Sequence, residues 1–102
     1  MSTEIRQYLG IAVAMEGNSG GYPHGERHAL ILYVAQEEGA EPDWDEAENI
    51  VLEKLWGNVR LRKTGVLAKN MDLQEPFLEM YTQAMEYGSA LLIYTEVEDE
   101  NT

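Results

Sequence analysis

The amino-acid sequence predicts an α+β domain with the element order β-β-α-β-α-β. Three observations support this class: short apolar runs without a helical period, two segments with helical spacing, and breaks at glycine and proline between them. The chain has 102 residues, enough for a single core and too few for two domains. We therefore expect one domain over residues 1–102, ending in a frayed acidic tail at 97–102.

Four segments have the pattern of strands. Residues 7–15 (QYLGIAVAM) and 28–35 (HALILYVA) are too short and too uniformly apolar for amphipathic helices, so they predict buried strands. In the segment that begins at Asn58, Val59 and Leu61 alternate with Arg60 and Arg62. This period of two predicts a half-exposed strand, and its basic side chains are typical of a sheet edge. Residues 89–97 (SALLIYTEV) predict the last strand.

The first helix is predicted at residues 44–56. Apolar residues recur there at helical spacing, Asp43 or Asp45 can cap the start, and Gly57 stops the pattern. The apolar positions are Ala47, Ile50, Val51 and Leu55.

The second helix is predicted to start at Pro76, which suits a first helical position. One apolar face is formed by Phe77, Met80, Tyr81 and Ala84. Gly88 lies just beyond the end, so the helix stops there.

The order of these elements predicts a mixed four-stranded sheet with two helices on one face. Helical crossovers between strands two and three, and between three and four, imply parallel neighbours, whereas strands one and two can pair antiparallel across the glycine-rich loop. If residues 28–38 were helical instead, the arrangement would be closer to a ferredoxin-like fold.

Charge excludes several classes of partner. Nineteen acidic residues against seven basic ones give a formal net charge of −12, which repels nucleic-acid backbones and anionic membrane surfaces. The N-terminus lacks the apolar core of a signal peptide, and no apolar run is long enough to span a bilayer. We expect a cytoplasmic protein that binds neither membrane nor nucleic acid directly. The absence of cysteine excludes disulfides and thiolate sites.

An acidic segment spans residues 37–48, where seven of twelve residues carry carboxylates and no base interrupts them. A solvated face that adds solubility is one interpretation, and a docking site for a basic partner is a more specific one. Carboxylates on a rigid helix can also imitate a nucleic-acid backbone and compete for a DNA- or RNA-binding protein. We take Glu41, Asp45 and Glu48 as its candidate contacts.

A glycine-rich loop at residues 16–28 joins the first two strands and is longer than ordinary hairpin loops. It lacks the phosphate-loop spacings, and Pro23 and Gly25 disfavour the helix that would align His24 with His28 as metal ligands. The loop is a mobile turn or a small-ligand site. The candidate contacts for such a site are Ser19, His24, Glu26, Arg27 and His28.

The apolar strands also predict an interface. With both helices on one face, the other face would expose a large apolar patch. A symmetric homodimer would cover it, and the glycine-rich loop folded over it is the alternative. One tyrosine in each of three strands is the candidate contact: Tyr8, Tyr33 and Tyr94.

We therefore expect a small acidic protein that acts without catalysis, as an interaction or regulatory module, through the acidic segment, the apolar sheet face or both. The alternative is a small-ligand-binding protein or enzyme whose site is loop 16–28. No catalytic residue, metal site or cofactor is assigned from the sequence.

Overall fold

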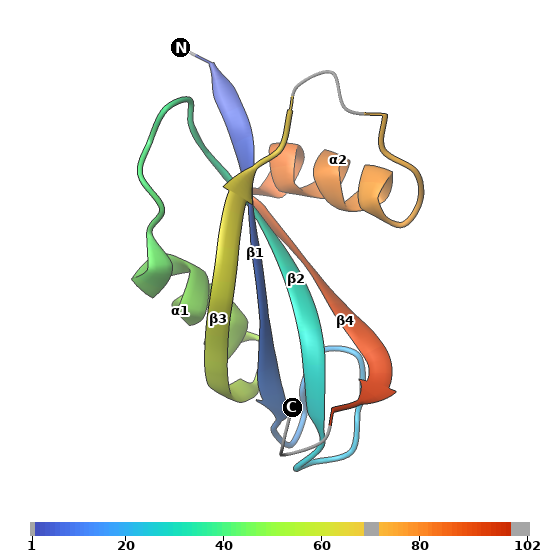
Figure 1. The fold of residues 1–102 in the computed structure, drawn as a ribbon. Helices are drawn as coiled ribbons and strands as arrows, with labels where there is room; N and C mark the ends of the chain where they lie inside the picture. The colour runs from blue at the N-terminus through green and yellow to red at the C-terminus, as the bar shows by residue number, and fades with distance from the viewer. Residues whose placement is uncertain (1, 69–71, 99–102) are drawn as a thin grey trace.

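The predicted element order is confirmed in a computed structural model, which describes residues 2–68 and 72–98 (Figure 1). The strands are β1 (Thr3–Ala14), β2 (Arg27–Glu37), β3 (Trp56–Val66) and β4 (Ser89–Val97), and the helices are α1 (Trp44–Glu53) and α2 (Phe77–Tyr87). The fold is α+β, as expected. Residues 28–37 lie in a strand, so the alternative with a helix at 28–38 is excluded.

The sheet is antiparallel throughout, with the order β3-β1-β2-β4. The expected parallel neighbours are therefore absent from the described sheet, and the prediction of a mixed sheet is corrected. The chain does cross from β2 through α1 to a strand of the same direction, β3. However, β1 lies between β2 and β3 and pairs with both of them in the opposite direction.

The two helices lie on opposite faces of the sheet, which corrects the prediction that they share one. Successive side chains of a strand point to opposite faces. On one face, Tyr8, Ala12, Leu30 and Leu32 form a core with Ala47 and Val51 of α1 and with Trp56. On the other face, Ile5, Ile31 and Tyr33 form a second core with Met80 and Ala84 of α2. Both faces of the two central strands are apolar because each face has its own helix.

The connection between the edge strands determines which part of the second face α2 covers. Val66 of β3 pairs with Arg6, Arg6 pairs with Val34, and Val34 pairs with Ser89 of β4. The end of β3 and the start of β4 therefore lie at the same end of the sheet, on opposite edges. Helix α2 lies near this end, as Figure 1 shows, and the far end of that face carries no helix.

The ends of the helices follow the sequence signals. The Asp43 carboxylate accepts a hydrogen bond from the Glu46 backbone N–H at 3.0 Å and caps α1. Gly88 adopts a left-handed conformation (φ +100°) and ends α2. Helix α1 stops at Glu53, short of the predicted 56, because Leu55 turns the chain with φ +64° and Trp56 already belongs to β3.

Gly10 is required where β1 meets an irregularity in β3. A Cβ atom at this position would collide with the Arg60 carbonyl oxygen and lie 2.8 Å from Leu61 Cα. Because both neighbours are backbone atoms, no side-chain rotation can relieve the contact. The close approach of β1 and β3 thus depends on the missing side chain.

Two remaining expectations concern the tail and the membrane. Val97 ends β4, and the Glu98 backbone N–H donates to the Arg27 carbonyl at 2.7 Å, so the first two residues of the predicted tail are held by β2. Residues 99–102 of that tail lie outside the described residues. None of the helices in the described ranges is long and apolar enough to cross a membrane.

Burial predicts a loss of stability at alkaline pH. Burial raises the pKa of Tyr33 above its ordinary value of 10.0, and the neighbouring Tyr94 raises it further. The folded state then holds the phenolic proton of Tyr33 more tightly than the unfolded state does. The stabilisation that this proton provides is therefore complete below pH 10 and is lost as pH rises above it. We expect Tyr33→Phe to flatten the fall in the free energy of unfolding above pH 10, measured by urea denaturation. An unchanged slope would contradict this.

Candidate functional site

The acidic segment 37–48 is exposed in the structure and leads from the end of β2 into α1. All seven of its carboxylate residues are exposed: Glu37, Glu38, Glu41, Asp43, Asp45, Glu46 and Glu48. Of the three predicted contacts, Asp45 and Glu48 lie on α1 and Glu41 lies in the preceding loop. None of these three pairs with a lysine or arginine among the described residues. Their negative charge is therefore not neutralised by the fold itself.

A network of buried and half-buried polar groups holds the start of this segment. The nearly buried Glu4 carboxylate accepts hydrogen bonds from Gln36 Nε2 at 2.8 Å and from the Gly39 N–H at 2.9 Å. Arg6 donates to Gln36 Oε1 at 3.0 Å and to the Ala40 carbonyl at 3.3 Å. These contacts tie residues 36–40 to β1, so the segment begins from a fixed position.

Tyr8 holds the next part of the segment. Its hydroxyl accepts a hydrogen bond from the Asp43 backbone N–H at 3.0 Å, directly at the cap of α1. Burial raises the pKa of Tyr8, so the hydroxyl stays neutral at physiological pH. The ring also contacts Trp44 edge-on, with ring centroids 5.4 Å apart. The start of α1 is thereby fixed on the sheet.

A hollow of about 340 Å³ lies beside Trp44, and we call it the Trp44 hollow. Its lining combines the Trp44 ring, the Asp45 and Glu48 side chains, and Val59 and Leu61 of β3. The Trp44 side chain is 40 % exposed, which is unusual for an indole. Arg60 also borders the hollow but forms no ion pair with either carboxylate.

This combination suits an organic cation. An indole face attracts a guanidinium or ammonium group, and two carboxylates beside it supply charge-assisted hydrogen bonds. The charge pattern predicted Asp45 and Glu48 as contacts, whereas Trp44 was not predicted. The signal was present, since a tryptophan within an acidic run departs from the composition of a purely solvated face.

The glycine-rich loop has a defined hydrogen-bonded conformation. Asn18 is nearly buried, and its side-chain amide donates to the Met15 carbonyl at 2.6 Å and to the Tyr22 carbonyl at 2.7 Å. The Tyr22 backbone N–H returns a hydrogen bond to Asn18 Oδ1 at 3.0 Å. Gly17, Gly20 and Gly21 adopt the positive φ angles that these turns need.

Ser19 is held by hydrogen bonds to Lys54 and Trp56. Its backbone N–H donates to the Lys54 carbonyl at 3.0 Å, and its hydroxyl oxygen accepts from Trp56 Nε1 at 3.2 Å. The predicted ligand contact Ser19 therefore fastens the loop to the first core. It contacts Trp56 and does not line the hollow that His24 and Arg27 border.

His28 is fully buried, and both of its ring nitrogens have partners. Nδ1 lies 2.7 Å from the Tyr94 carbonyl oxygen, and Nε2 lies 3.0 Å from Glu26 Oε1. The ring packs on Tyr22 and Trp56, at centroid distances of 4.3 and 5.7 Å. A carbonyl oxygen only accepts, so Nδ1 is the donor of this hydrogen bond and carries the proton. His28 thus links β2, β4 and the loop.

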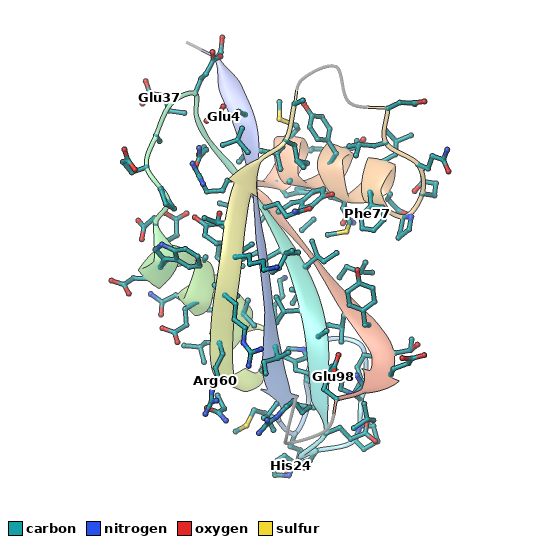
Figure 2. All side chains as sticks on the ribbon, viewed as in Figure 1. Glu4, His24, Glu37, Arg60, Phe77 and Glu98 are labelled. Atoms are coloured by element: carbon teal, nitrogen blue, oxygen red, sulfur yellow. The ribbon has the colours of Figure 1, made fainter. Side chains whose placement is uncertain are left out.

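The remaining loop candidates border a second hollow of about 510 Å³. His24, Glu26 and Arg27 line it together with Val13 and Glu98. Figure 2 shows His24 at the end of the sheet opposite Glu4 and Glu37, so the loop and the start of the acidic segment form separate regions. The described residues hold no group of three or more metal-ligating side chains. Within the described residues, the Ser19 hydroxyl accepts from the Trp56 indole and forms no hydrogen bond with either histidine.

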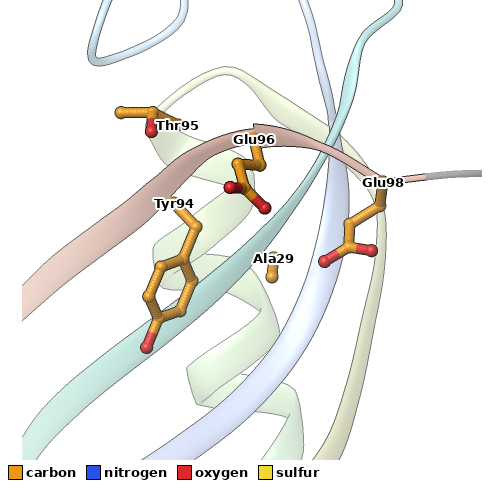
Figure 3. A pocket seen from close by; sticks show the side chains of 5 residues that line it. All are labelled: Ala29, Tyr94, Thr95, Glu96 and Glu98. Atoms are coloured by element: carbon orange, nitrogen blue, oxygen red, sulfur yellow. The ribbon is translucent and has the colours of Figure 1, made fainter.

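The three predicted interface tyrosines are separated by the fold. Tyr8 and Tyr33 are buried in the cores on opposite faces, at 2 % and 1 % exposure, whereas Tyr94 is 44 % exposed. Tyr94 lines a hollow of about 450 Å³ with Ala29, Thr95, Glu96 and Glu98. In Figure 3 the Glu96 and Glu98 carboxylates both point toward Ala29, opposite the Tyr94 ring. Only Tyr94 of the three is available to a partner.

Comparison with known proteins finds no matching family model, curated sequence or solved structure.

The hydrogen bond between His28 and the Tyr94 carbonyl predicts where the ring proton lies. We expect nitrogen-15 NMR to show Nδ1 of His28 protonated, because a carbonyl oxygen can only accept. Glu26→Gln leaves the Tyr94 carbonyl in place, so Nδ1 should keep its proton in this variant too. His24→Gln removes the exposed histidine and serves as the assignment control. An unprotonated Nδ1 in the unmodified protein would contradict this hydrogen bond.

Proposed function

We propose that this protein is a non-catalytic interaction module that binds a basic protein partner through the acidic segment 37–48. The observation that carries the proposal is the Trp44 hollow, where an exposed indole, Asp45 and Glu48 converge on one surface. An arginine or lysine side chain of the partner would stack on Trp44 and pair with the two carboxylates.

The rigidity of the segment supports this role. Glu4, Arg6 and Tyr8 fix the chain from residue 36 to the cap of α1 through the hydrogen bonds described above. A partner would therefore meet carboxylates that are already in place, which lowers the entropic cost of binding. The remaining exposed acids of the segment would speed association with a basic surface.

The geometry also favours binding over catalysis. His28 is enclosed, its nitrogens are occupied, and the Ser19 hydroxyl accepts from the Trp56 indole. Ser19 and His28 are therefore used to fasten the loop. A module without chemistry of its own accounts for these contacts.

A second candidate is a small-ligand site at the 510 Å³ hollow. Three of the predicted loop residues, His24, Glu26 and Arg27, do border this one space. A thermal-shift screen with metal ions, nucleotides and small organic acids tests it. A ligand at 100 times its dissociation constant adds about 2.7 kcal/mol to the free energy of unfolding.

The proposed function predicts a charge-dependent and ring-dependent affinity for a basic peptide. The probe is a fluorescein-labelled peptide of alternating arginine and glycine, measured by fluorescence anisotropy. Replacing Glu41 and Glu48 with Gln and Asp45 with Asn should weaken binding roughly tenfold, since exposed ionic contacts contribute up to about 1 kcal/mol each. Trp44→Ala should weaken it further, and Trp44→Phe less.

The matched control removes the same number of charges from α2 and the loop before it, in Glu75→Gln, Glu79→Gln and Glu86→Gln. This variant should bind the peptide like the unmodified protein. Equal weakening in both triple variants would show that only the net charge matters and would overturn the proposed site. Added salt should slow association in the unmodified protein and have less effect on the acidic-segment variant.

A further inference from the structure

Strand β4 bulges away from β2 opposite Ala29. His28 pairs with Val97 and Leu30 pairs with Ile93, so the single residue Ala29 lies opposite three residues of β4: Tyr94, Thr95 and Glu96. The extra residues bend β4 outward and leave the hollow of about 450 Å³ seen in Figure 3, which we call the Ala29 hollow. Bulges of this kind are common beside functional sites, where they redirect side chains.

Hydrogen bonds fix the walls of the Ala29 hollow. The buried His28 ring holds the Tyr94 carbonyl oxygen at 2.7 Å, where the bulge begins. Beyond the bulge, the Glu98 backbone N–H donates to the Arg27 carbonyl at 2.7 Å. The bulge is thus attached to β2 at both ends, so a ligand would meet walls that are already in place.

The Ala29 hollow offers groups that bind a cation. In Figure 3 the Glu96 and Glu98 carboxylates point toward Ala29, opposite the ring of Tyr94, which is exposed. Neither carboxylate forms an ion pair with another residue in the described ranges. An ammonium group in this hollow would donate charge-assisted hydrogen bonds to the carboxylates, and the Tyr94 ring would attract it further.

A cation of the protein lies beside this hollow. Arg27 precedes Ala29 by two residues on β2, so both side chains point to the second face, at the end that α2 leaves open. Arg27 lines the hollow of about 510 Å³, which we call the loop hollow, and Glu98 lines both hollows. Arg27 is half-buried and forms no ion pair among the described residues. An unpaired guanidinium therefore adjoins two unpaired carboxylates.

The floor beside these charges is apolar. Ala29 pairs with Ile11, and Arg27 pairs with Val13, so Ile11 and Val13 lie on the same face of the sheet. Both are half-buried, since no helix covers this end of the face. An apolar group placed on this floor would remove part of its surface from water.

We propose that the Ala29 hollow and the loop hollow together bind a free α-amino acid with an apolar side chain. The α-ammonium group pairs with Glu96 and Glu98, and the α-carboxylate pairs with the Arg27 guanidinium. The side chain lies on Ala29 and Ile11, beside the Tyr94 ring. An α-amino acid carries both charges on one carbon, which matches charges of both signs around one apolar floor. This proposal deepens the small-ligand candidate and does not rest on binding of a basic partner at the Trp44 hollow.

Titrations with L-phenylalanine and two analogues test the ligand class. The analogue 3-phenylpropanoate lacks the ammonium group, and L-phenylalaninamide lacks the carboxylate. We expect L-phenylalanine to shift the NMR signal of the Ala29 methyl group in a saturable manner. Each analogue should bind roughly fivefold more weakly, because it loses one ionic contact. No saturable shift with L-phenylalanine, or an analogue that binds as tightly, would overturn the proposal.

Variants assign each charge of the ligand to a residue. Arg27→Gln should weaken L-phenylalanine binding roughly fivefold and leave L-phenylalaninamide unaffected, because only the former carries the carboxylate. Glu96→Gln should weaken both ligands. Arg62→Gln removes a cation of β3 that lines neither hollow, and it is the matched control for Arg27→Gln. Circular dichroism confirms that each variant is folded.

Two outcomes would contradict this assignment. One is equal weakening of both ligands by Arg27→Gln, and the other is equal weakening of L-phenylalanine binding by Arg27→Gln and Arg62→Gln. Trp44→Ala should leave L-phenylalanine binding unchanged while it weakens the basic peptide. The two sites can therefore fail independently.

Discussion

The antiparallel pairing of β1 with β2 is the constraint on which the rest of the structure depends. Both strands are central in the sheet, and both carry apolar side chains on each face. Tyr8 and Leu32 point to one side, whereas Ile5 and Tyr33 point to the other. A sheet that is apolar on both faces needs cover on both, and one amphipathic helix on each face provides it.

Local sequence signals predicted most of the elements. Asp43 caps α1 and Gly88 ends α2 as expected, because a cap depends on a few neighbouring residues. The basic strand is an edge, as the alternation of Arg60 and Arg62 with Val59 and Leu61 indicated. What failed was strand adjacency. A crossover helix predicts the direction of the next strand but not which strand lies between, and here β1 occupies that place.

The candidate sites were predictable to different degrees. Exposed carboxylates such as Asp45 and Glu48 follow directly from the charge pattern, and the structure adds the Trp44 ring that they surround. The loop residues could not be sorted from the sequence, because spacing in a loop carries no geometry. His28 is buried against Trp56 and Tyr22, and the Ser19 hydroxyl accepts from Trp56, whereas His24 is exposed and Arg27 is half-buried. Tertiary packing made that division, and no local pattern records it.

Nuclear Overhauser effects between labelled methyl groups and aromatic rings test most directly whether the two helices pack on opposite faces of the sheet. The structure predicts contacts from the Val51 methyls to the Trp56 ring and from the Met80 methyl to the Tyr33 ring, since each pair shares one core. It also predicts no contact between Val51 and Met80, which lie on opposite faces. A Val51–Met80 contact would place both helices on one face and would contradict this account.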